Sequence, residues 1–295
     1  MKSIDRKIAI SLIFIAVFNV SWASIFVRLT GASGVICATW RLVFSTIITW
    51  LTLILLGKVD ELRTLNRRAV ILSILSGISL AVHFASWMES LFLLSVGVSV
   101  TLVVTYPLIT ALIEHFILRE KMKTIQWVGM VLAFLGVAAL SFTSVKDFSN
   151  NETNSFLGII LALTGALTAA VYFVIGRVIR KIISTVTYTS ITYTSAALIL
   201  LVFSTSMGYN LTNYNSTTWI YFLLLAIVPM LGGHSVLNYL LKYIKASIIT
   251  ATVLGEPVGA SILAILILNE ILPMHSYIYM MITIIGIFIV LYHGD

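Results

Sequence analysis

TVLGEPVGASILAILILNE (residues 252–270) places a glutamate, Glu256, and a proline, Pro257, inside an otherwise apolar segment. The segment is long enough to cross the hydrocarbon core of a bilayer, which takes about 20 residues of helix. A carboxylate at that depth costs roughly 2.5 kcal/mol or more, and a proline removes a backbone hydrogen bond. We therefore expect both residues to face a cavity or a protein partner rather than lipid.

The rest of the chain has the same apolar character. Of its 295 residues, 60% are hydrophobic and only 10% are charged, whereas a soluble domain carries about 25% charged residues. The sequence therefore indicates an all-α polytopic membrane protein. Apolar runs of spanning length predict ten transmembrane helices, near residues 8–28, 35–56, 70–93, 96–118, 124–143, 156–176, 185–207, 217–240, 246–268 and 274–292.

The connections between these runs are short. The longest, TSVKDFSNNETNS (143–155), separates the first five spans from the last five, and no segment is long enough for a soluble catalytic or nucleic-acid-binding domain. The first apolar run exceeds the core of a typical signal peptide, about 7–15 residues, so we expect it to be retained. The single cysteine, Cys37, excludes an internal disulfide and any CxxC motif. We predict no metal site and no cofactor.

The basic residues indicate the topology. With a cytoplasmic N-terminus, fifteen of the eighteen Lys and Arg residues fall on the cytoplasmic side, as the positive-inside rule requires. The exceptions are Lys146 in an outer loop, and Arg28 and Arg41 at the outer ends of the first two spans. An even number of spans returns the C-terminus to the same side. We therefore predict cytoplasmic N- and C-termini, in the plasma membrane of a prokaryotic cell.

The two halves of the chain resemble each other at an offset of 150 residues. At this offset LVVTYPLITALIEHFILRE (102–120) aligns without gaps with the segment 252–270, so that Pro107 meets Pro257 and Glu120 meets Glu270. A proline in mid-span kinks the helix and frees a backbone carbonyl. Paired breaks in corresponding helices are a sequence-level indication of a binding site.

Each half has five spans, an odd number, so the second half must enter the membrane from the opposite face. We therefore expect two inverted five-helix repeats, residues 1–145 and 156–295, joined by an outer linker over 146–155. Inverted repeats are a recurring plan of secondary transporters, whose substrate sites lie near the midplane between the repeats.

Several stretches resemble the EamA-type transporters of the drug/metabolite transporter superfamily. They are SWASIFVRL (21–29), ATWRL (38–42), SLFLLSVGVSVTLVVTYPLITALIEHFILREKM (90–122) and YLLKYIKASIITATVLGEPVGASILAILILNEIL (239–272). The resemblance covers essentially the full chain. It implies ten helices in two inverted repeats, with a central cavity lined mainly by the first four helices of each repeat. Members of this family export amino acids, other metabolites or drugs, or carry nucleotide sugars and triose phosphates, so the resemblance leaves the cargo open.

Polar residues within the spans are the candidates for the site. Glu256 is interpreted as a group that exchanges a proton or binds a substrate amine; the alternative is a structural group bonded to helix ends near Pro257. His83 and His234, offset by 151 residues, can relay protons or bind cargo, unless each is a buried histidine bonded to a backbone carbonyl. Arg41 is a candidate residue of the outer cavity or of a gate, because a guanidinium in a span needs a partner or water.

Aromatic and amide side chains complete the candidate set. Core packing is the competing interpretation for each aromatic ring, whereas together the rings suit an amphipathic or partly apolar cargo. The residues are Trp87, Tyr106, Tyr172, Asn19 and Asn238.

The remaining carboxylates are interpreted as structural. Glu89 is expected either to line the outer vestibule or to pair with Arg41, and pairing is favoured. Glu114 is expected to pair with Arg119 or a nearby loop lysine. Glu120 and Glu270, which inversion places at opposite faces, are interpreted as helix-end or gate ion pairs.

These observations predict a secondary active transporter. We expect an exporter or exchanger of small organic metabolites, with amino acids or their analogues favoured, that works by alternating access. Expected partners are a small-molecule substrate, membrane lipids and protons as a candidate coupling ion, but no nucleic acid; the oligomeric state is left open. A passive channel or facilitator is the alternative. An intramembrane enzyme is disfavoured because the sequence has no HExxH, GxSxG or Asp-rich motif.

Overall fold

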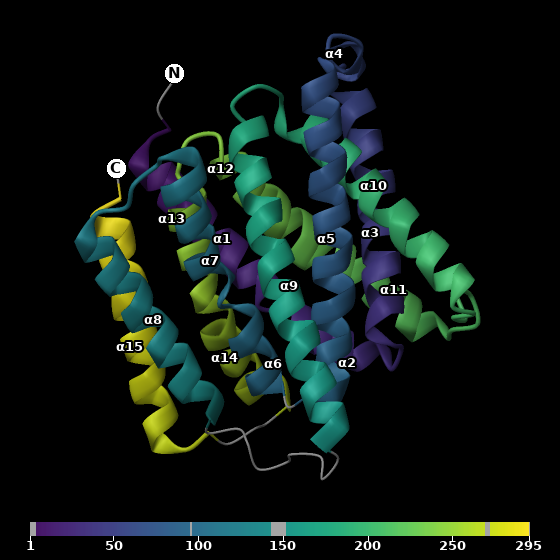
Figure 1. Cartoon of the computed structure of the whole chain (residues 1–295). Coiled ribbons are helices and arrows are strands. Elements are labelled where there is room, and N and C mark those ends of the chain that lie inside the picture. The colour runs from purple at the N-terminus through teal and green to yellow at the C-terminus, as the bar shows by residue number, and fades with distance from the viewer. Residues whose placement is uncertain (1–3, 95, 143–151, 269–271, 295) are drawn as a thin grey trace.

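The structure, a computed structural model, describes residues 4–94, 96–142, 152–268 and 272–294 (Figure 1). Within these residues ten helical segments are long and apolar enough to cross a membrane, which confirms the predicted all-α polytopic fold. Each boundary lies within three residues of its expected position. The segments are Arg6–Thr30, Gly34–Leu55, Arg67–Leu93, Val98–Leu118, Thr124–Ser141, Phe156–Ile179, Thr185–Ser206, Ser216–Leu240, Ala246–Ile267 and Met274–Tyr292.

Six of these spans are continuous helices, and a short helix, α4 (Val59–Arg63), lies between the second and third spans. Several begin with a polar cap: the Asn66 side chain accepts a hydrogen bond from the Ala69 N–H, and Ser184 accepts one from the Thr187 N–H. Such caps satisfy N–H groups that have no partner within the helix. The continuous helices are α3 (Gly34–Leu55), α5 (Arg67–Leu93), α8 (Thr124–Phe142), α9 (Glu152–Ile179), α10 (Thr185–Ser206) and α15 (Met274–Tyr292).

The other four spans are interrupted. The first consists of α1 (Arg6–Val20) and α2 (Ala23–Thr30), and the fourth of α6 (Val96–Val103), α7 (Tyr106–Ile113) and a π-helical turn, η1 (Glu114–Leu118). The eighth consists of α11 (Ser216–Leu225), the π-helix η3 (Ala226–Ser235) and α12 (Val236–Leu240). The ninth consists of α13 (Ala246–Thr252), the 3₁₀ turn η4 (Val253–Gly255) and α14 (Glu256–Leu268). Irregular backbone at membrane depth is tolerated only where protein buries it or where it lines a cavity.

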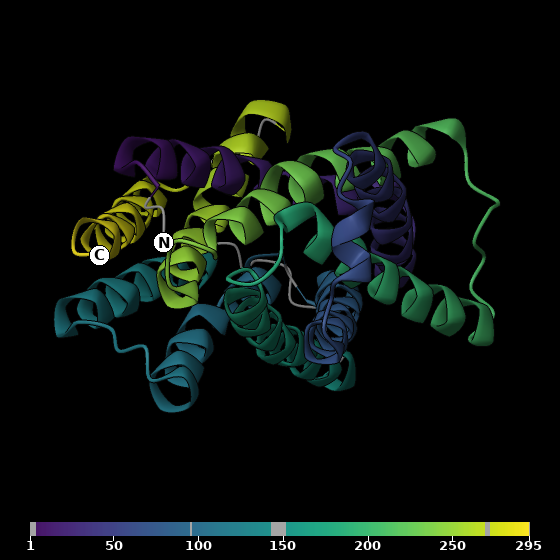
Figure 2. The ribbon, with the colours of Figure 1, turned by 90° about the horizontal axis from the view of Figure 1, so that it is seen from above.

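The helices of the two halves pack in matching pairs. The third span packs on the sixth (α5 on α9) and the first on the eighth (α1 on η3), so each pairing becomes the other when the halves are exchanged. The same holds for the second span on the seventh (α3 on α10) and the fifth on the tenth (α8 on α15). Figure 1 shows α1 and α9 running in opposite directions, and Figure 2 shows the α8–α15 pair at one side of the bundle.

The α8–α15 pair depends on small residues at its contact. A Cβ on Gly129 of α8 would lie 2.8 Å from the Gly286 carbonyl oxygen of α15, closer than real Cβ atoms come to backbone. Glycine therefore lets the two backbones meet, as small residues commonly do between membrane helices.

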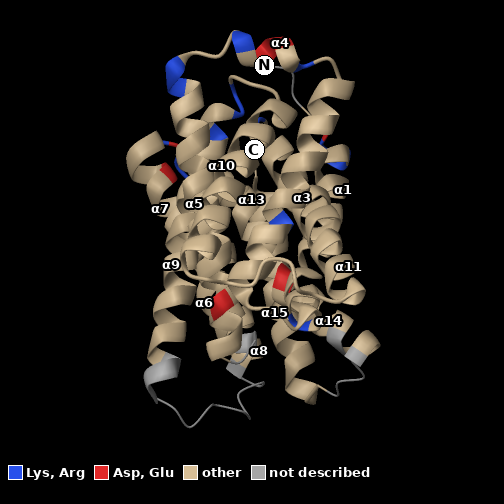
Figure 3. Cartoon of the chain, turned by 90° about the vertical axis from the view of Figure 1, so that its right-hand side faces the viewer, with Lys and Arg blue, Asp and Glu red and all other residues tan. Residues whose placement is uncertain are grey.

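Basic side chains gather at one end of the bundle. Lys and Arg are concentrated at the end that carries both termini and α4 (Figures 1 and 3). Lys2, Lys146, Glu270 and most of the expected linker over 146–155 lie outside the described residues.

Candidate functional site

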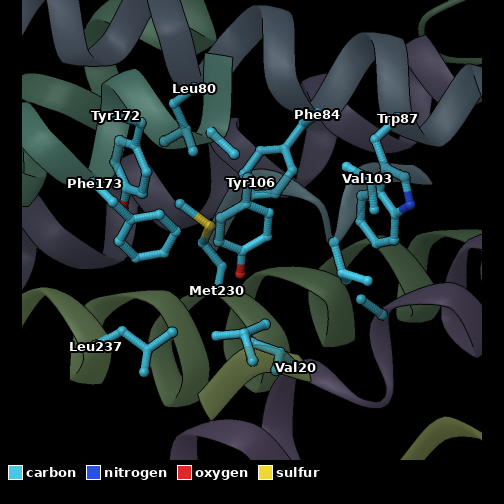
Figure 4. Close-up of a cluster of buried hydrophobic side chains, with 14 of the residues drawn as sticks. Val20, Leu80, Phe84, Trp87, Val103, Tyr106, Tyr172, Phe173, Met230 and Leu237 are labelled. Atoms are coloured by element: carbon cyan, nitrogen blue, oxygen red, sulfur yellow. The ribbon is translucent and has the colours of Figure 1, made fainter. Parts of the chain in front are cut away.

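A small cavity lies inside the helix bundle, where the interrupted spans meet. Its volume is about 20 Å³, room for roughly one or two water molecules. Figure 4 shows Val20, Trp87, Val103 and Tyr106, from different helices, around the same interior region. The lining residues are Val20, Ala23, Arg41, His83, Trp87, Val103, Val104, Tyr106, His234 and Glu256.

Two of the lining residues stand at helix breaks. Glu256 is the first residue of α14, directly after the 3₁₀ turn η4, and Tyr106 is the first residue of α7. Pro257 and Pro107 follow them, in the first turn, where a missing N–H costs the helix nothing. A carboxylate is favoured at a helix N-terminus because of the unpaired N–H groups and the helix dipole there. The break beside Pro257 therefore makes a position at which Glu256 is tolerated within the span.

His83 and Trp87 lie one turn apart on α5 and form one wall. Their rings are stacked, with centroids 6.0 Å apart and planes 8° apart. The His83 Nδ1 atom lies 2.9 Å from the Gly165 carbonyl oxygen of α9. A carbonyl oxygen only accepts, so Nδ1 carries the proton in this bond. The backbone contact offered as an alternative for His83 is thus present, and Nε2 is the nitrogen left for other chemistry.

His234 belongs to the π-helix η3, which contains Pro229. Its ring centroid lies 6.5 Å from that of His83 and 5.2 Å from that of Phe84. Its Nδ1 has no hydrogen-bond partner among the residues that the structure describes. The π-helix around Pro229 was not predicted from the sequence, although a third proline within a span was a visible signal. π-Helical turns are frequent at functional sites because they rotate a side chain out of the regular helical order.

Arg41 is fully buried in α3. Its guanidinium carbon lies 4.0 Å from the centroid of the Phe84 ring, a cation–π contact. The expected pairing of Arg41 with Glu89 is wrong: a Glu89 carboxylate oxygen accepts a hydrogen bond from the Val35 N–H at 3.3 Å, in the first turn of α3. Glu89 thus caps a helix, whereas Arg41 lines the cavity.

Comparison with known proteins decides the family. The profile of the EamA-like transporter family matches residues 7–142 and 156–292. The chain belongs to this family, within the drug/metabolite transporter superfamily. It is similar to the uncharacterized transporter YdfC of Bacillus subtilis (strain 168), with 26% identity over 194 residues. That match covers 65% of this chain and 61% of the length of the relative.

The fold of this EamA-like chain also matches a solved crystal structure. The TM-score is 0.80 at 14% identity, over 97% of this chain and 98% of the other. At that identity the match shows the fold alone. The family and the relative together indicate an integral multi-pass membrane transporter rather than an enzyme.

Three of the expected site residues of this EamA-like transporter lie outside the cavity lining. The Asn19 amide donates to the Ile15 carbonyl of its own helix at 2.7 Å. The Asn238 amide donates to the Tyr172 hydroxyl, and both side chains are fully buried. The other six candidates, Glu256, His83, His234, Arg41, Trp87 and Tyr106, all line the cavity. The four lining residues that sequence reasoning missed, Val20, Ala23, Val103 and Val104, are apolar and carry no chemical signal.

Carboxylates of the first half hold the second half at the end of the bundle that carries the termini. Glu114 accepts hydrogen bonds from the Ala246 and Ser247 N–H groups at 2.6 and 2.8 Å, so it caps α13 rather than pairing with Arg119 or a loop lysine as expected. Glu61 of α4 accepts from the Ser184 N–H and the Thr187 hydroxyl at 2.7 and 2.6 Å. Both contacts join segments far apart in the sequence.

Glu120 forms the ion pair that was expected of it at the end of its span. Its carboxylate oxygens lie 3.2 Å from Arg177 Nε and 2.6 Å from Lys181 Nζ. Partial burial alone would raise the pKa of Glu120. The Lys181 hydrogen bond and the Arg177 charge outweigh burial and hold the pKa below its ordinary value. Together with the contacts of Glu61 and Glu114, this pair joins the two halves of the chain at the end that carries the termini. Within the described residues, no three His, Cys, Asp or Glu side chains come close enough together to hold a metal ion.

Proposed function

We propose that this transporter is a secondary carrier that exports or exchanges small organic metabolites, with amino acids or their analogues favoured, by alternating access. One observation carries the proposal: an interior cavity brings Glu256 and His234 of the second half together with Arg41 and His83 of the first. Ionisable groups within a membrane segment are costly and mark substrate or ion pathways. A site assembled from both halves changes its exposure when the halves move relative to each other.

The proposed repeats, residues 1–145 and 156–295 around a linker over 146–155, have three supports. The family profile matches each half once. The four pairings α5–α9, α1–η3, α3–α10 and α8–α15 are preserved as a set when the halves are exchanged. The breaks beside Pro107 and Pro257 fall at the same place in each half. Five spans per half and the opposite directions of α1 and α9 support inversion of one repeat relative to the other (Figure 1).

The proposed orientation places both termini in the cytoplasm, in the plasma membrane of a prokaryotic cell. The clustering of Lys and Arg at the end that carries the termini supports it (Figure 3). Export then requires that the contacts of Glu61, Glu114 and Glu120 at this end open to admit cargo from the cytoplasm.

Cargo must widen the cavity to bind. Its volume of about 20 Å³ suits water, and even a small amino acid is several times larger. The small volume supports an arrangement in which the two halves are closed around the site. Relative rocking of the halves, driven by the cargo gradient, by exchange or by protons, opens it to one side at a time. Glu256 either exchanges the coupling proton or binds the substrate amine, and His83 and His234 assist it.

Counterflow into reconstituted proteoliposomes tests the function. Vesicles preloaded with single unlabelled amino acids or metabolites are assayed for accumulation of the matching external tracer. We expect counterflow for one compound class. We expect Glu256→Gln to reduce it about tenfold or more, as the loss of a buried charge partner implies. Glu89→Gln is the matched control, because it removes a carboxylate charge outside the cavity lining but keeps an oxygen to accept from the Val35 N–H.

The outcomes separate the alternatives. Counterflow that Glu256→Gln leaves unchanged would keep the carrier but reject this site. Equilibrating flux without counterflow would favour a passive channel or facilitator.

A further inference from the structure

Arg41 is a buried cation whose hydrogen-bonding capacity is unused among the residues that the structure describes. None of its three guanidinium nitrogens has a hydrogen-bond partner there, and the side chain is 0% exposed. Its position is fixed by the Phe84 ring, 4.0 Å away. Buried charges in proteins are normally paired and hydrogen-bonded. An unpaired guanidinium that borders a cavity therefore points to a ligand.

Two tyrosine hydroxyls near Arg41 are engaged elsewhere. The Tyr193 hydroxyl shares a hydrogen bond with Ser235 at 2.8 Å, and the Tyr172 hydroxyl accepts from the Asn238 amide. Glu256 lies close enough for its charge to act on Arg41, yet it does not hydrogen-bond to the guanidinium. An acidic and a basic side chain thus line one cavity without a hydrogen bond between them.

We propose that Arg41 binds the carboxylate of the cargo while Glu256 binds its ammonium group, so that the carrier selects α-amino acids over compounds that carry only one of the two charges. This assignment deepens the proposed function and rests on it. The guanidinium presents its N–H groups in a planar fork that matches the two oxygens of a carboxylate. A zwitterion gives both side chains a partner of opposite charge, whereas an amine leaves Arg41 unpaired and a simple acid leaves Glu256 unpaired.

The other cavity-lining residues determine which side chains the cargo can carry. Apart from Arg41 and Glu256, the lining consists of aliphatic, aromatic and imidazole groups. A charged cargo side chain would lack a partner among them, so the cargo side chain is uncharged. The apolar wall of Val20, Ala23, Val103 and Val104 suits an aliphatic one.

Wild-type counterflow with three matched probes tests the assignment without any substitution. L-Leucine carries both charges, L-leucinamide keeps the ammonium group but loses the carboxylate, and N-acetyl-L-leucine keeps the carboxylate but loses the ammonium group. Each is added outside as an inhibitor of labelled leucine counterflow. We expect both analogues to inhibit at concentrations about a hundredfold or more above that of leucine, since a site built to bind a polar group rejects analogues that lack it.

Three variants of Arg41 and Glu256 then test the role of each side chain. Arg41→Met keeps the length and apolar contacts of the side chain and removes the guanidinium, so we expect leucine and leucinamide to inhibit within about threefold of each other while N-acetyl-leucine stays weak. For Glu256→Gln we expect leucine and N-acetyl-leucine to inhibit at similar concentrations, while leucinamide stays weak. Arg41→Lys keeps the charge without the fork and should retain part of the discrimination against the amide.

The outcomes distinguish this assignment from the proposed function. If wild type exchanges leucine but leucinamide inhibits equally well, or if Arg41→Met leaves the discrimination intact, the role of Arg41 is wrong and the carrier stands. If wild type exchanges only solutes without an amino or a carboxyl group, the cargo class and this assignment both fail.

Discussion

Tyr106 and Glu256 occupy the same place in the two halves of the chain, and both border the cavity. Each is the first residue of the helix that follows a break, each precedes a proline, and their positions differ by the 150-residue offset of the repeat. The framework is thus repeated but the chemistry is not, because one half presents a phenol where the other presents a carboxylate. The two proposed repeats in this way contribute different side chains to the cavity, which suits the proposed zwitterionic cargo.

The phenol of Tyr106 should contribute less to transport than the Glu256 carboxylate. Tyr106→Phe removes one neutral hydrogen-bonding group, and we expect it to reduce counterflow by about two- to tenfold, the usual range for such a loss. The measurement is the initial rate of counterflow at equal amounts of reconstituted protein. Tyr172→Phe is the control, since that hydroxyl accepts from Asn238 outside the cavity lining. A larger loss of transport in Tyr172→Phe than in Tyr106→Phe would contradict the site.

His83 allows its structural and functional nitrogens to be separated. An asparagine amide can replace the Nδ1–H donor to the Gly165 carbonyl, whereas a glutamine amide reaches the position of Nε2. We therefore expect His83→Asn to keep the thermal stability of wild type but lower counterflow, and His83→Gln to lower the Tm. Unchanged counterflow in His83→Asn would make His83 a packing residue.

The sequence predicted the spans and most of the polar residues that line the cavity, because charged residues and prolines are conspicuous within apolar transmembrane segments. Arg41, His83 and Glu256 stand out within their segments, and the two helix breaks followed from Pro107 and Pro257. The positive charge of the loops indicated the same end of the bundle at which basic side chains gather (Figure 3).

Contacts between the halves could not be predicted in the same way. Whether Glu114 meets Arg119 or the first turn of α13 depends on how the fourth span rotates about its axis, which the sequence pattern leaves open. The bond between Asn238 and Tyr172 joins two candidates to each other instead of directing them to the cavity. The apolar lining residue Val104 resembles any other valine of a span.

Weakening the Glu120 ion pair should open the end of the bundle that carries the termini. The reporter is Ser247→Cys in a Cys37→Ala background, because both residues are fully buried and the Ser247 hydroxyl has no hydrogen-bond partner among the described residues. With Glu120→Gln added, we expect faster labelling by a membrane-impermeant maleimide applied from that side. The glutamine oxygen can still accept a hydrogen bond, but the charge attraction to Arg177 and Lys181 is lost, so the closed state loses part of its stability advantage.

Asp60→Asn is the matched control for this experiment. Asp60 and Arg63 form an ion pair within α4, with side chains 85% and 81% exposed, and such pairs contribute about 0–1 kcal/mol. Labelling of the Ser247→Cys reporter should not change in this variant. Equal acceleration by Asp60→Asn and Glu120→Gln would show a general effect of charge rather than opening of the contact.

The contribution of Glu120 to stability should disappear in acid. The pKa of Glu120 is held below its ordinary value: burial would raise it, but the Lys181 hydrogen bond and the Arg177 charge prevail. A carboxyl with a lowered pKa in the folded state stabilises that state above its unfolded pKa, about 4.3, and loses this effect as the pH falls through the folded pKa. The difference in Tm between wild type and Glu120→Gln should therefore be constant at neutral pH and shrink below about pH 4.3. A difference that persists undiminished in acid would mean that the neutral side chain, through its packing, supports this end of the bundle without the ion pair.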